Sequence, residues 1–257
     1  MAQSAGASVR AIYRYPVKGL SPESLERIAL EAGETVPFDR AYAVENGAGR
    51  FDPEAPHHLP KINFLMLMRD ERLATLRTQF DEATHTLTIY RANKQVARGQ
   101  LSSPLGRKMI EQFLGAYMQE ELRGAPKIVF AEGHSFTDAA AKYVHIINLE
   151  TLRELERAAG SSVNPLRFRP NIIIDGIGAW EELGWIGKTI AAGETELEAV
   201  ERTQRCAATD VDPDTGKRDT ALAAVLQRTW GHTDFGIYAR VARSGAIAVG
   251  DAVAARV

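Results

Sequence analysis

The chain has 257 residues, of which 45% are hydrophobic, and a net charge of −2. A chain of this size can bury a full core in one large domain or two modest ones, and its charge excludes a broad electrostatic attraction to nucleic acid or anionic membranes. The single cysteine excludes an intrachain disulfide, an iron–sulfur cluster held by four thiolates of this chain and a zinc site built on paired cysteines.

The sequence also bears on where the protein works. No apolar run approaches the roughly 18 residues that a membrane span requires. The N-terminus is small and polar and lacks the apolar core of a signal peptide. We therefore expect a protein of the reducing cytoplasm, with no membrane and no nucleic-acid partner.

The first half of the chain alternates short apolar stretches with turn-forming residues, a pattern typical of strands. Expected strands cover residues 9–15, 25–30, 41–44, 62–68 and 86–90. The segment 46–61 is rich in glycine and proline and is expected to be a long irregular loop. Apolar residues at helical spacing predict a helix over residues 69–80. A second helix, 104–117, starts after the capping residue Ser103.

The second half of the chain is again rich in strand patterns. Expected strands cover residues 127–130, 144–147, 171–175, 185–190, 194–202, 236–242 and 248–256. Asn148 is placed to cap a helix that ends at Gly160, because glycine is a common helix stop. A short helix is expected over residues 219–227. His145 lies within an apolar strand, so we expect it to be buried with its hydrogen bonds satisfied.

Strands outnumber helices and do not alternate with them regularly. This distribution favours a β-rich α+β protein with barrel-like sheets over a doubly wound parallel sheet. Gly124 and Pro126 make the segment 120–126 the expected boundary between two domains. The predicted domains are therefore residues 8–122 and 123–257.

The only cysteine, Cys206, follows Arg205 at the end of a predicted strand and precedes small and polar residues. A lone cysteine is most often a small buried hydrophobe. However, a neighbouring positive charge favours a thiolate, and functional groups are common where strands meet loops. These residues leave two interpretations open, a thiolate ligand to a metal cofactor and simple core packing.

A basic segment, Arg167-Phe168-Arg169-Pro170-Asn171, leads into the strand expected at 171–175. It is either a solvated loop or a grip for an oxyanion, because the planar guanidinium matches phosphate and the Asn amide adds a donor. Lys18 and Arg40 are similar isolated cations at strand ends. These residues alone do not decide between the two interpretations.

Other kinds of site lack the residues that they need. Gly176 and Gly178 are not followed by the third glycine of a dinucleotide-binding loop. The segment that starts at Asp212 resembles the beginning of a calcium loop, but Ala223 stands where the bidentate carboxylate is required. No histidine pair has the HExxH spacing of a zinc protease, and no serine lies in the Gly-x-Ser-x-Gly elbow of a hydrolase.

Several motifs occur in a characteristic order along the chain. They are Tyr15-Pro16-Val17-Lys18-Gly19, Phe38-Asp39-Arg40, Ser135-Phe136-Thr137-Asp138, Arg167-Phe168-Arg169-Pro170-Asn171, Arg205-Cys206, Val211-Asp212-Pro213-Asp214-Thr215-Gly216, Phe235-Gly236-Ile237-Tyr238 and Val249-Gly250-Asp251. This ordered set resembles the MOSC-domain family, and most closely its amidoxime-reducing branch. The resemblance covers residues 9–255 and rests on the set rather than on one motif.

The resemblance implies a MOSC β-barrel with a smaller N-terminal β-barrel-like domain, and a molybdenum cofactor bound between them. This cofactor is a pterin dithiolene (molybdopterin) that carries a phosphate. The matching positions make Cys206 the catalytic thiolate ligand to molybdenum, and Arg169, Asn171 and Arg205 the contacts to the pterin and phosphate. The other implied cofactor-binding residues are Lys18, Gly19, Arg40, Thr137, Asp138 and Thr209. An association with pyridoxal phosphate binding is a secondary expectation.

By the same resemblance, the protein is expected to be a reductase that removes oxygen from N-hydroxylated compounds with two electrons and two protons. Electrons would come from a separate donor of the ferredoxin, flavin reductase or cytochrome b5 type. Asp138 and Asp210 are the candidates for a general acid. The main alternative is a module that carries the cofactor, or carries sulfur on Cys206 as a persulfide, without reductase activity. A further alternative is a barrel without cofactor that serves in interactions.

The chain also departs from the usual pattern of the family. Gly19 and Asp210 replace a frequent serine and a frequent threonine, and the segments 46–61 and 139–143 differ from their usual form. We expect these changes to affect the range of substrates more than the binding of cofactor.

Overall fold

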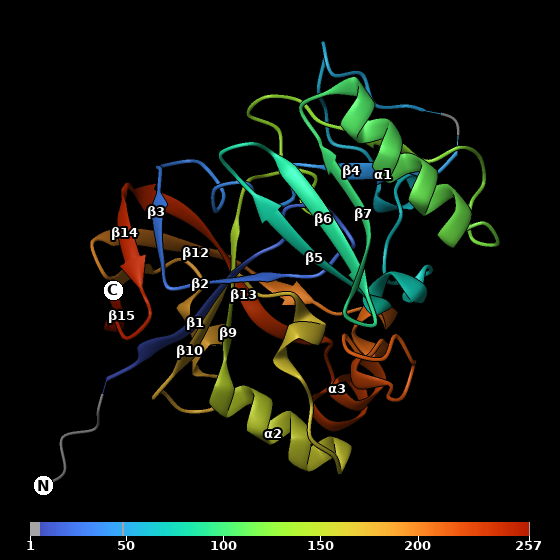
Figure 1. Cartoon of the computed structure of the whole chain (residues 1–257). Coiled ribbons are helices and arrows are strands. Elements are labelled where there is room, and N and C mark those ends of the chain that lie inside the picture. Colours follow the sequence, from blue (N-terminus) through green and yellow to red (C-terminus); the bar gives the residue numbers. More distant parts are fainter. Residues whose placement is uncertain (1–5, 48, 257) are drawn as a thin grey trace, which may run out of the picture.

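The computed structural model describes residues 6–47 and 49–256 of the chain (Figure 1). Its centre is a curled sheet of eight strands, in the order β15-β11-β12-β13-β9-β10-β1-β2. All neighbouring strands are antiparallel except β9 and β10. The strands of this main sheet are β1 (Ser8–Arg14), β2 (Glu23–Leu25), β9 (Val144–Asn148), β10 (Ile172–Asp175), β11 (Thr189–Ala192), β12 (Thr195–Gln204), β13 (Asp234–Arg243) and β15 (Val253–Arg256).

A second body, residues 61–117, which we call the upper body, lies above the main sheet in Figure 1. Its sheet contains three antiparallel strands, β5 (Leu76–Asp81), β6 (Thr86–Arg91) and β7 (Lys94–Gln100). Helix α1 (Pro104–Tyr117) packs on β7. The side chain of Ser103 caps this helix by accepting a hydrogen bond from the Gly106 N–H at 3.0 Å, as the sequence predicted.

Strands from the start of the chain complete sheets of its second half. β1 pairs with β10 in the main sheet, and β3 (Arg27–Leu30) pairs with β14 (Gly245–Ala248). β4 (Ala43–Glu45) pairs with β8 (Lys127–Val129). The boundary near residue 122 stays a prediction, because strands on both sides of it share hydrogen-bonded pairs.

Two apolar clusters hold the main sheet in place. One fills its concave side and includes Ile12, Ile190 and Ile237, each fully buried. The other lies under α2 (Leu149–Ala159) and α3 (Leu222–Trp230), which cover the opposite side. Full burial of each isoleucine stabilises the fold by about 1.5–3 kcal/mol. The buried sheet therefore fixes the positions of the residues at the ends of its strands.

Short 3₁₀ turns connect many of these elements. They are η1 (Lys61–Asn63), η2 (Glu71–Thr75), η3 (Pro165–Phe168), η4 (Glu181–Trp185) and η5 (Ala207–Asp210). The prediction of a β-rich α+β protein is confirmed by this inventory. No helix in the described part of the chain is long and apolar enough to cross a membrane.

The strand predicted at 62–68 is wrong. η1 occupies its start, and a tight turn follows it. This turn is held by the fully buried Asp70, whose carboxylate accepts from the Met66 N–H at 2.9 Å and from the Arg69 guanidinium at 2.8 Å. A buried carboxylate that satisfies local backbone donors stabilises a turn over a strand, and the apolar run hid this effect.

The helix predicted at 69–80 is also wrong, because it is replaced by η2 and β5. Leu76, Thr78 and Phe80 alternate as buried residues along β5. Thr78 interrupts the apolar alternation in the sequence, but its hydroxyl pairs with that of Ser21 at 2.8 Å. Because Thr78 is polar but buried, the apolar residues of this segment showed helical spacing in the sequence instead of the alternation of a strand.

Smaller differences concern element ends. β7 was not predicted, since its residues are mostly exposed and polar. The strand expected at 185–190 starts later, as β11, because η4 precedes it, and the helix expected at 219–227 is α3. His145 is buried in β9 and hydrogen bonded, as predicted.

Candidate functional site

A cleft of about 1060 Å³ lies between the upper body and the main sheet. Met66 belongs to the segment that joins η1 to η2, and Thr203 to β12, so the two walls come from distant parts of the chain. The cleft is lined by all ten residues that the sequence assigned to a site: Lys18, Gly19, Arg40, Thr137, Asp138, Arg169, Asn171, Arg205, Cys206 and Thr209. The structure brings these residues together, and their roles stay predictions.

Two of the cleft arginines have unusual backbones. Arg40 and Arg169 have φ angles of 50° and 51°, in the left-handed region that residues with a side chain seldom adopt. Such conformations cost about 1–3 kcal/mol each and cluster at functional sites. The Arg40 Nη2 donates to the Arg169 carbonyl at 3.1 Å, which ties the two strained turns to each other.

The ring of Tyr15 supports both arginines from behind the cleft. The guanidinium carbons of Arg40 and Arg169 lie 4.4 and 4.1 Å from the ring centroid. Each such cation–π contact contributes about 0.5–2 kcal/mol, more when water is excluded. Tyr15 is completely buried, its hydroxyl has no hydrogen-bond partner in the described part of the chain, and burial raises its pKa. The tyrosine is therefore placed to hold guanidiniums rather than to ionise.

The charge of the cleft is only partly balanced. Arg40 pairs with the buried carboxylate of Asp39. Among the described residues, neither Arg169 nor Arg205 has a carboxylate within ion-pair distance, and one Arg169 nitrogen, Nη2, has no partner at all. Burial lowers the pKa of both to about 10, with Arg40 adding to the effect at Arg169. Both stay protonated at neutral pH, so the cleft suits an anionic ligand.

Arg205 is held by backbone oxygens and by a histidine. Its Nε donates to the Phe235 carbonyl at 2.9 Å, and its Nη1 donates to the Phe168 carbonyl at 3.3 Å. Its Nη2 contacts Nε2 of His145. Burial first, and then the charge of Arg205, lower the pKa of His145 well below its ordinary value. The imidazole is thus neutral, with Nε2 accepting from Arg205 and Nδ1 donating to the Arg169 carbonyl at 3.4 Å.

The side chains of three predicted site residues form hydrogen bonds with other groups of the protein. The Asn171 amide accepts from the His145 N–H at 3.0 Å and donates to the Tyr13 carbonyl at 3.2 Å. The Thr137 hydroxyl donates to the Ala139 carbonyl, and the Thr209 hydroxyl donates to the Cys206 carbonyl. These side chains shape the cleft wall, while the free donors in the cleft belong to the arginines and lysines.

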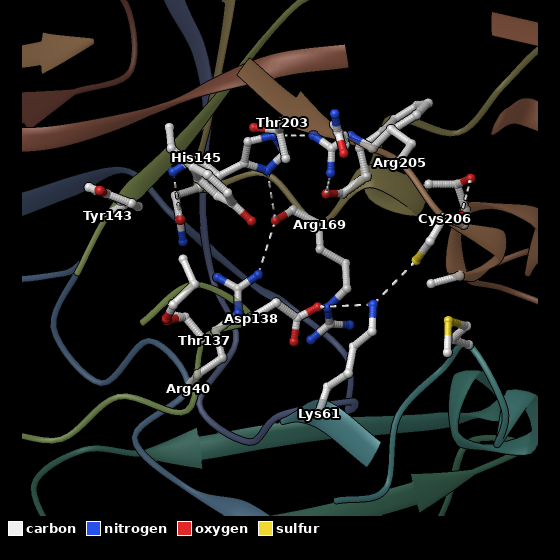
Figure 2. A pocket seen from close by; sticks show the side chains of 18 of the residues that line it. Arg40, Lys61, Thr137, Asp138, Tyr143, His145, Arg169, Thr203, Arg205 and Cys206 are labelled. Atoms are coloured by element: carbon white, nitrogen blue, oxygen red, sulfur yellow. Dashed lines mark hydrogen bonds and ion pairs between the residues drawn. The ribbon is translucent and has the colours of Figure 1, made fainter. Parts of the chain in front are cut away.

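Cys206 lies just beyond the end of β12, is the N-cap residue of η5 and is half-buried. Its Sγ lies 3.6 Å from the Nζ of Lys61, and Figure 2 shows the lysine reaching the thiol from the opposite wall. The Arg167 guanidinium holds the loop after Cys206 through Asp212 and Asp219, at 3.0 and 2.8 Å. The alternative of simple core packing is wrong, because the thiol faces a charged cleft.

Neither proposed general acid is supported. Burial raises the pKa of Asp138, but the Lys18 ammonium outweighs that effect, and the pKa lies below its ordinary value. Asp138 is therefore a carboxylate at neutral pH. Asp210 does not line the cleft; its carboxylate accepts from the Leu222 N–H at 3.0 Å at the start of α3.

Sequence reasoning missed several residues of the cleft. Lys61 ends the irregular segment 46–61, whose sequence has no periodicity that predicts its backbone conformation. His145 was expected only in a structural role, yet it contacts Arg205. Tyr143 and Tyr238 stack on each other at 5.5 Å and also line the cleft. Tyr143 directly precedes β9 and Tyr238 lies in β13, and no spacing in the sequence relates the two residues.

Comparison with known families decides what kind of protein this is. The family model described as "MOSC N-terminal beta barrel domain" matches residues 6–121, and the model described as "MOSC domain" matches residues 131–254. The chain belongs to the MOSC-domain family. This result confirms the resemblance seen in the ordered motifs.

The chain is similar to proteins named mitochondrial amidoxime-reducing components. It is 31% identical to component 2 of Rattus norvegicus over 122 residues, which is 43% of this chain and 36% of that protein. It is 24% identical to component 1 of Mus musculus over 280 aligned positions, covering 96% of this chain and 81% of that protein. The match to the rat protein thus spans about a third of its length.

Among solved structures, the YUAD protein from Bacillus subtilis is similar, with a TM-score of 0.46 and 14% identity over 96% of this chain and 93% of that one. YiiM from Geobacillus stearothermophilus has a TM-score of 0.34 and 20% identity over 44% of this chain and 54% of that one.

MOSC domains are associated with binding of the molybdenum cofactor, and the cleft can be tested for its fit to that group. A soft metal takes a thiolate ligand, and Cys206 provides one thiol within the cleft. A phosphate takes guanidinium donors, and the free Nη2 of Arg169 and the uncompensated charge of Arg205 meet that need. The residues present fit the cofactor. None of the comparisons supports pyridoxal phosphate.

Proposed function

We propose that this protein binds a molybdenum cofactor in the cleft and reduces N-hydroxylated compounds with electrons from a separate donor protein. One observation carries the proposal. Two half-buried guanidiniums, those of Arg169 and Arg205, have no carboxylate partner among the described residues and line the same cleft as the single cysteine of the chain. Uncompensated buried charge costs folding energy, so its presence beside a thiol supports binding of an anion that also carries a thiophilic metal.

The chain's own residues would share the work of binding. Cys206 would supply the thiolate to molybdenum. Arg169 and Arg205 would hold the pterin and phosphate, with Arg40 beside them on the Tyr15 ring. The remaining lining residues, with Lys61 added to the predicted set, are Lys18, Gly19, Lys61, Thr137, Asp138, Asn171 and Thr209.

When bound, the cofactor would supply the two-electron chemistry by which an N–O oxygen leaves as water. The chain would orient the reactants and fix the charges around them. His145 keeps Arg205 in place without adding charge, and Lys18 neutralises Asp138. Among the described residues, Lys61 is the one side chain whose nitrogen or oxygen lies within hydrogen-bond distance of the Cys206 sulfur.

The donor protein and the location of the chain are also proposals. The names of the curated relatives contain the word mitochondrial, whereas we expect this chain to act in the cytoplasm. A ferredoxin, a flavin reductase or a cytochrome b5-type protein would deliver the electrons one at a time or in pairs.

The test begins with the purified protein from cells that make the cofactor. We expect about one molybdenum per chain and reduction of benzamidoxime by dithionite-reduced methyl viologen. Cys206→Ser should lose nearly all turnover, because a hydroxyl is a poor ligand for a soft metal.

The outcomes separate the proposed function from its alternative. Molybdenum without turnover on any N-hydroxylated compound would favour a cofactor carrier. Absence of molybdenum from every preparation would overturn the proposal. Unchanged turnover in Cys206→Ser would show that the cysteine is not the metal ligand.

A further inference from the structure

Lys61 makes a polar contact with the cysteine from the opposite wall of the cleft. Its Nζ lies 3.6 Å from Sγ of Cys206 and 3.9 Å from Oδ2 of Asp138. Within the described ranges, no other nitrogen or oxygen of a side chain is within hydrogen-bond distance of that sulfur. A small molecule that reaches Cys206 therefore lies next to this ammonium.

The backbone around Lys61 is fixed although the segment is irregular. The Phe64 N–H donates to the Lys61 carbonyl at 3.0 Å, the Asn63 side chain donates to the Pro60 carbonyl at 2.9 Å, and the Arg123 guanidinium contacts the Ile62 carbonyl. The side chain itself is 33% exposed. The charge is thus held at the cleft entrance while remaining in contact with solvent.

The charge of Lys61 is poorly compensated. Asp138 is its only acidic neighbour in the described part of the chain, and Asp138 makes the closer contact with Lys18. Of the other acids that line the cleft, Asp234 pairs with Arg202 at 3.7 Å. Glu201 is exposed and makes no ion pair among the residues described.

Part of the cleft wall is apolar. Met66, Leu67, Met68 and Ile186 line the cleft together with Lys61. Thioether and aliphatic groups offer surface to an aromatic or alkyl part of a ligand but cannot balance a positive charge on it. A cationic ligand would bring its charge close to the ammonium, whereas a neutral or anionic ligand would gain from it.

We propose that Lys61 makes this site selective for N-hydroxylated compounds without positive charge, and that anionic compounds are favoured over cationic ones. The inference rests on the proposed function, and it names the charge class of its substrates. Lys61 acts here as a specificity residue through its fixed charge, and the apolar entrance accepts the body of the ligand.

The first experiment uses the cofactor-free protein and its single cysteine. Cys206 is labelled with two methanethiosulfonate reagents of similar size, the anionic sulfonatoethyl and the cationic trimethylammonioethyl compound. The ratio of their two rates reports the local charge and does not depend on the fraction of thiolate, because both reagents attack through the same species. We expect the anionic reagent to be favoured about tenfold relative to the same ratio for 2-mercaptoethanol.

Variants of Lys61 decide the outcome. Lys61→Met should lower the rate ratio about three- to tenfold, and Lys61→Arg should keep it. Lys94→Met, in the exposed strand β7, is the matched control and should leave the ratio unchanged. The difference should shrink in 0.5 M salt, since part of the charge is exposed. An equal ratio in wild type and Lys61→Met would overturn the inference.

A second experiment uses the cofactor-loaded protein and three benzamidoximes that differ only at the 4-position: carboxylate, methyl and trimethylammonium. We expect kcat/KM to be about tenfold higher for the anion than for the cation, mainly through KM, and Lys61→Met to level the series. If wild type reduces none of the three, the proposed function fails. If it reduces all three with one KM, only the charge selectivity fails.

Discussion

The two walls of the cleft are built differently. The main-sheet wall carries Arg205, Arg169 and Asn171, and each of them is fixed by hydrogen bonds to backbone oxygens or amides. The upper-body wall carries Lys61, the first residue of η1, and Met66, in the segment between η1 and η2. One wall thus consists of locked donors at the ends of buried strands, and the other of a lysine and thioethers at a partly exposed entrance.

This difference separates two tasks. A cofactor that stays bound needs donors whose positions are set before it arrives. A substrate that enters and leaves needs a surface that can vary without loss of the fold. The main-sheet wall suits the first task, and the upper-body wall suits the second. Each of the following predictions tests that division, from the largest expected effect to the smallest.

The support of the main-sheet wall by Tyr15 is the most sensitive point. Tyr15→Leu should lower the free energy of unfolding by about 3 kcal/mol, because it removes a buried ring and two cation–π contacts. Tyr15→Phe should leave the free energy of unfolding unchanged or raise it by about 1 kcal/mol, because the hydroxyl has no hydrogen-bond partner among the described residues. Urea unfolding measures both. Equal losses of unfolding free energy in the two variants would show that the hydroxyl, and not the ring, stabilises this wall.

Arg169 should be expendable for folding and essential for binding. Arg169→Met should reduce molybdenum content at least tenfold, since it removes the free donor of the wall. The cofactor-free variant should be as stable as wild type or about 1 kcal/mol more stable, because an uncompensated buried charge is gone. Metal analysis and urea unfolding check the two parts, with the exposed Arg153→Met as control. Full metal content in Arg169→Met would contradict the assignment.

The neutral His145 makes the main-sheet wall sensitive to acid. Its folded-state pKa lies well below the unfolded value, so the unfolded chain binds a proton that the folded chain does not. Stability is therefore lost as pH falls below about 6.5, by about 1 kcal/mol at pH 5.5. Urea unfolding at pH 7.5 and 5.5 measures the loss. His145→Gln, which keeps one acceptor and one donor, should lose less, and an equal loss would exclude His145 as the cause.

The upper-body wall should tolerate change. Lys61→Met is expected to alter the free energy of unfolding by less than about 0.5 kcal/mol, because the lysine is partly exposed and its ion pair is long. The same urea titration measures this. A loss of several kcal/mol would mean that Lys61 is part of the structural frame and that the two walls do not divide the tasks.

The sequence predicted the main-sheet wall better than the upper-body wall, for a physical reason. The strands of a buried sheet show as apolar or alternating patterns, and the motif residues flank two of them: Arg169 comes shortly before β10, and Cys206 shortly after β12. Their positions in space then depend on strand pairing, which repeats along the sheet. The ordered motifs added the family, and with it the expectation that distant residues meet.

The upper-body wall depends on interactions that leave no periodic signal. Asp70 folds the segment after η1 into a turn by accepting from Met66 and Arg69, which no spacing rule indicates. Thr78 is buried through its partner Ser21, so a strand resembled a helix. The position of Lys61 follows from these local contacts, and the lysine was therefore not predicted.

The pairing of β1 with β10 has a consequence for how the chain is made. Ile12 lies opposite Ile172, so the first strand leaves the ribosome long before its partner exists. The upper body, whose sheet and helix are contiguous in the chain, can form in that interval. One edge of β1 can pair early with β2, but its other edge stays open until β10 emerges, and long-range pairing of this kind is slow. Closure of the main sheet is then the late step, and the arginine cleft is assembled only when the nascent chain is nearly complete.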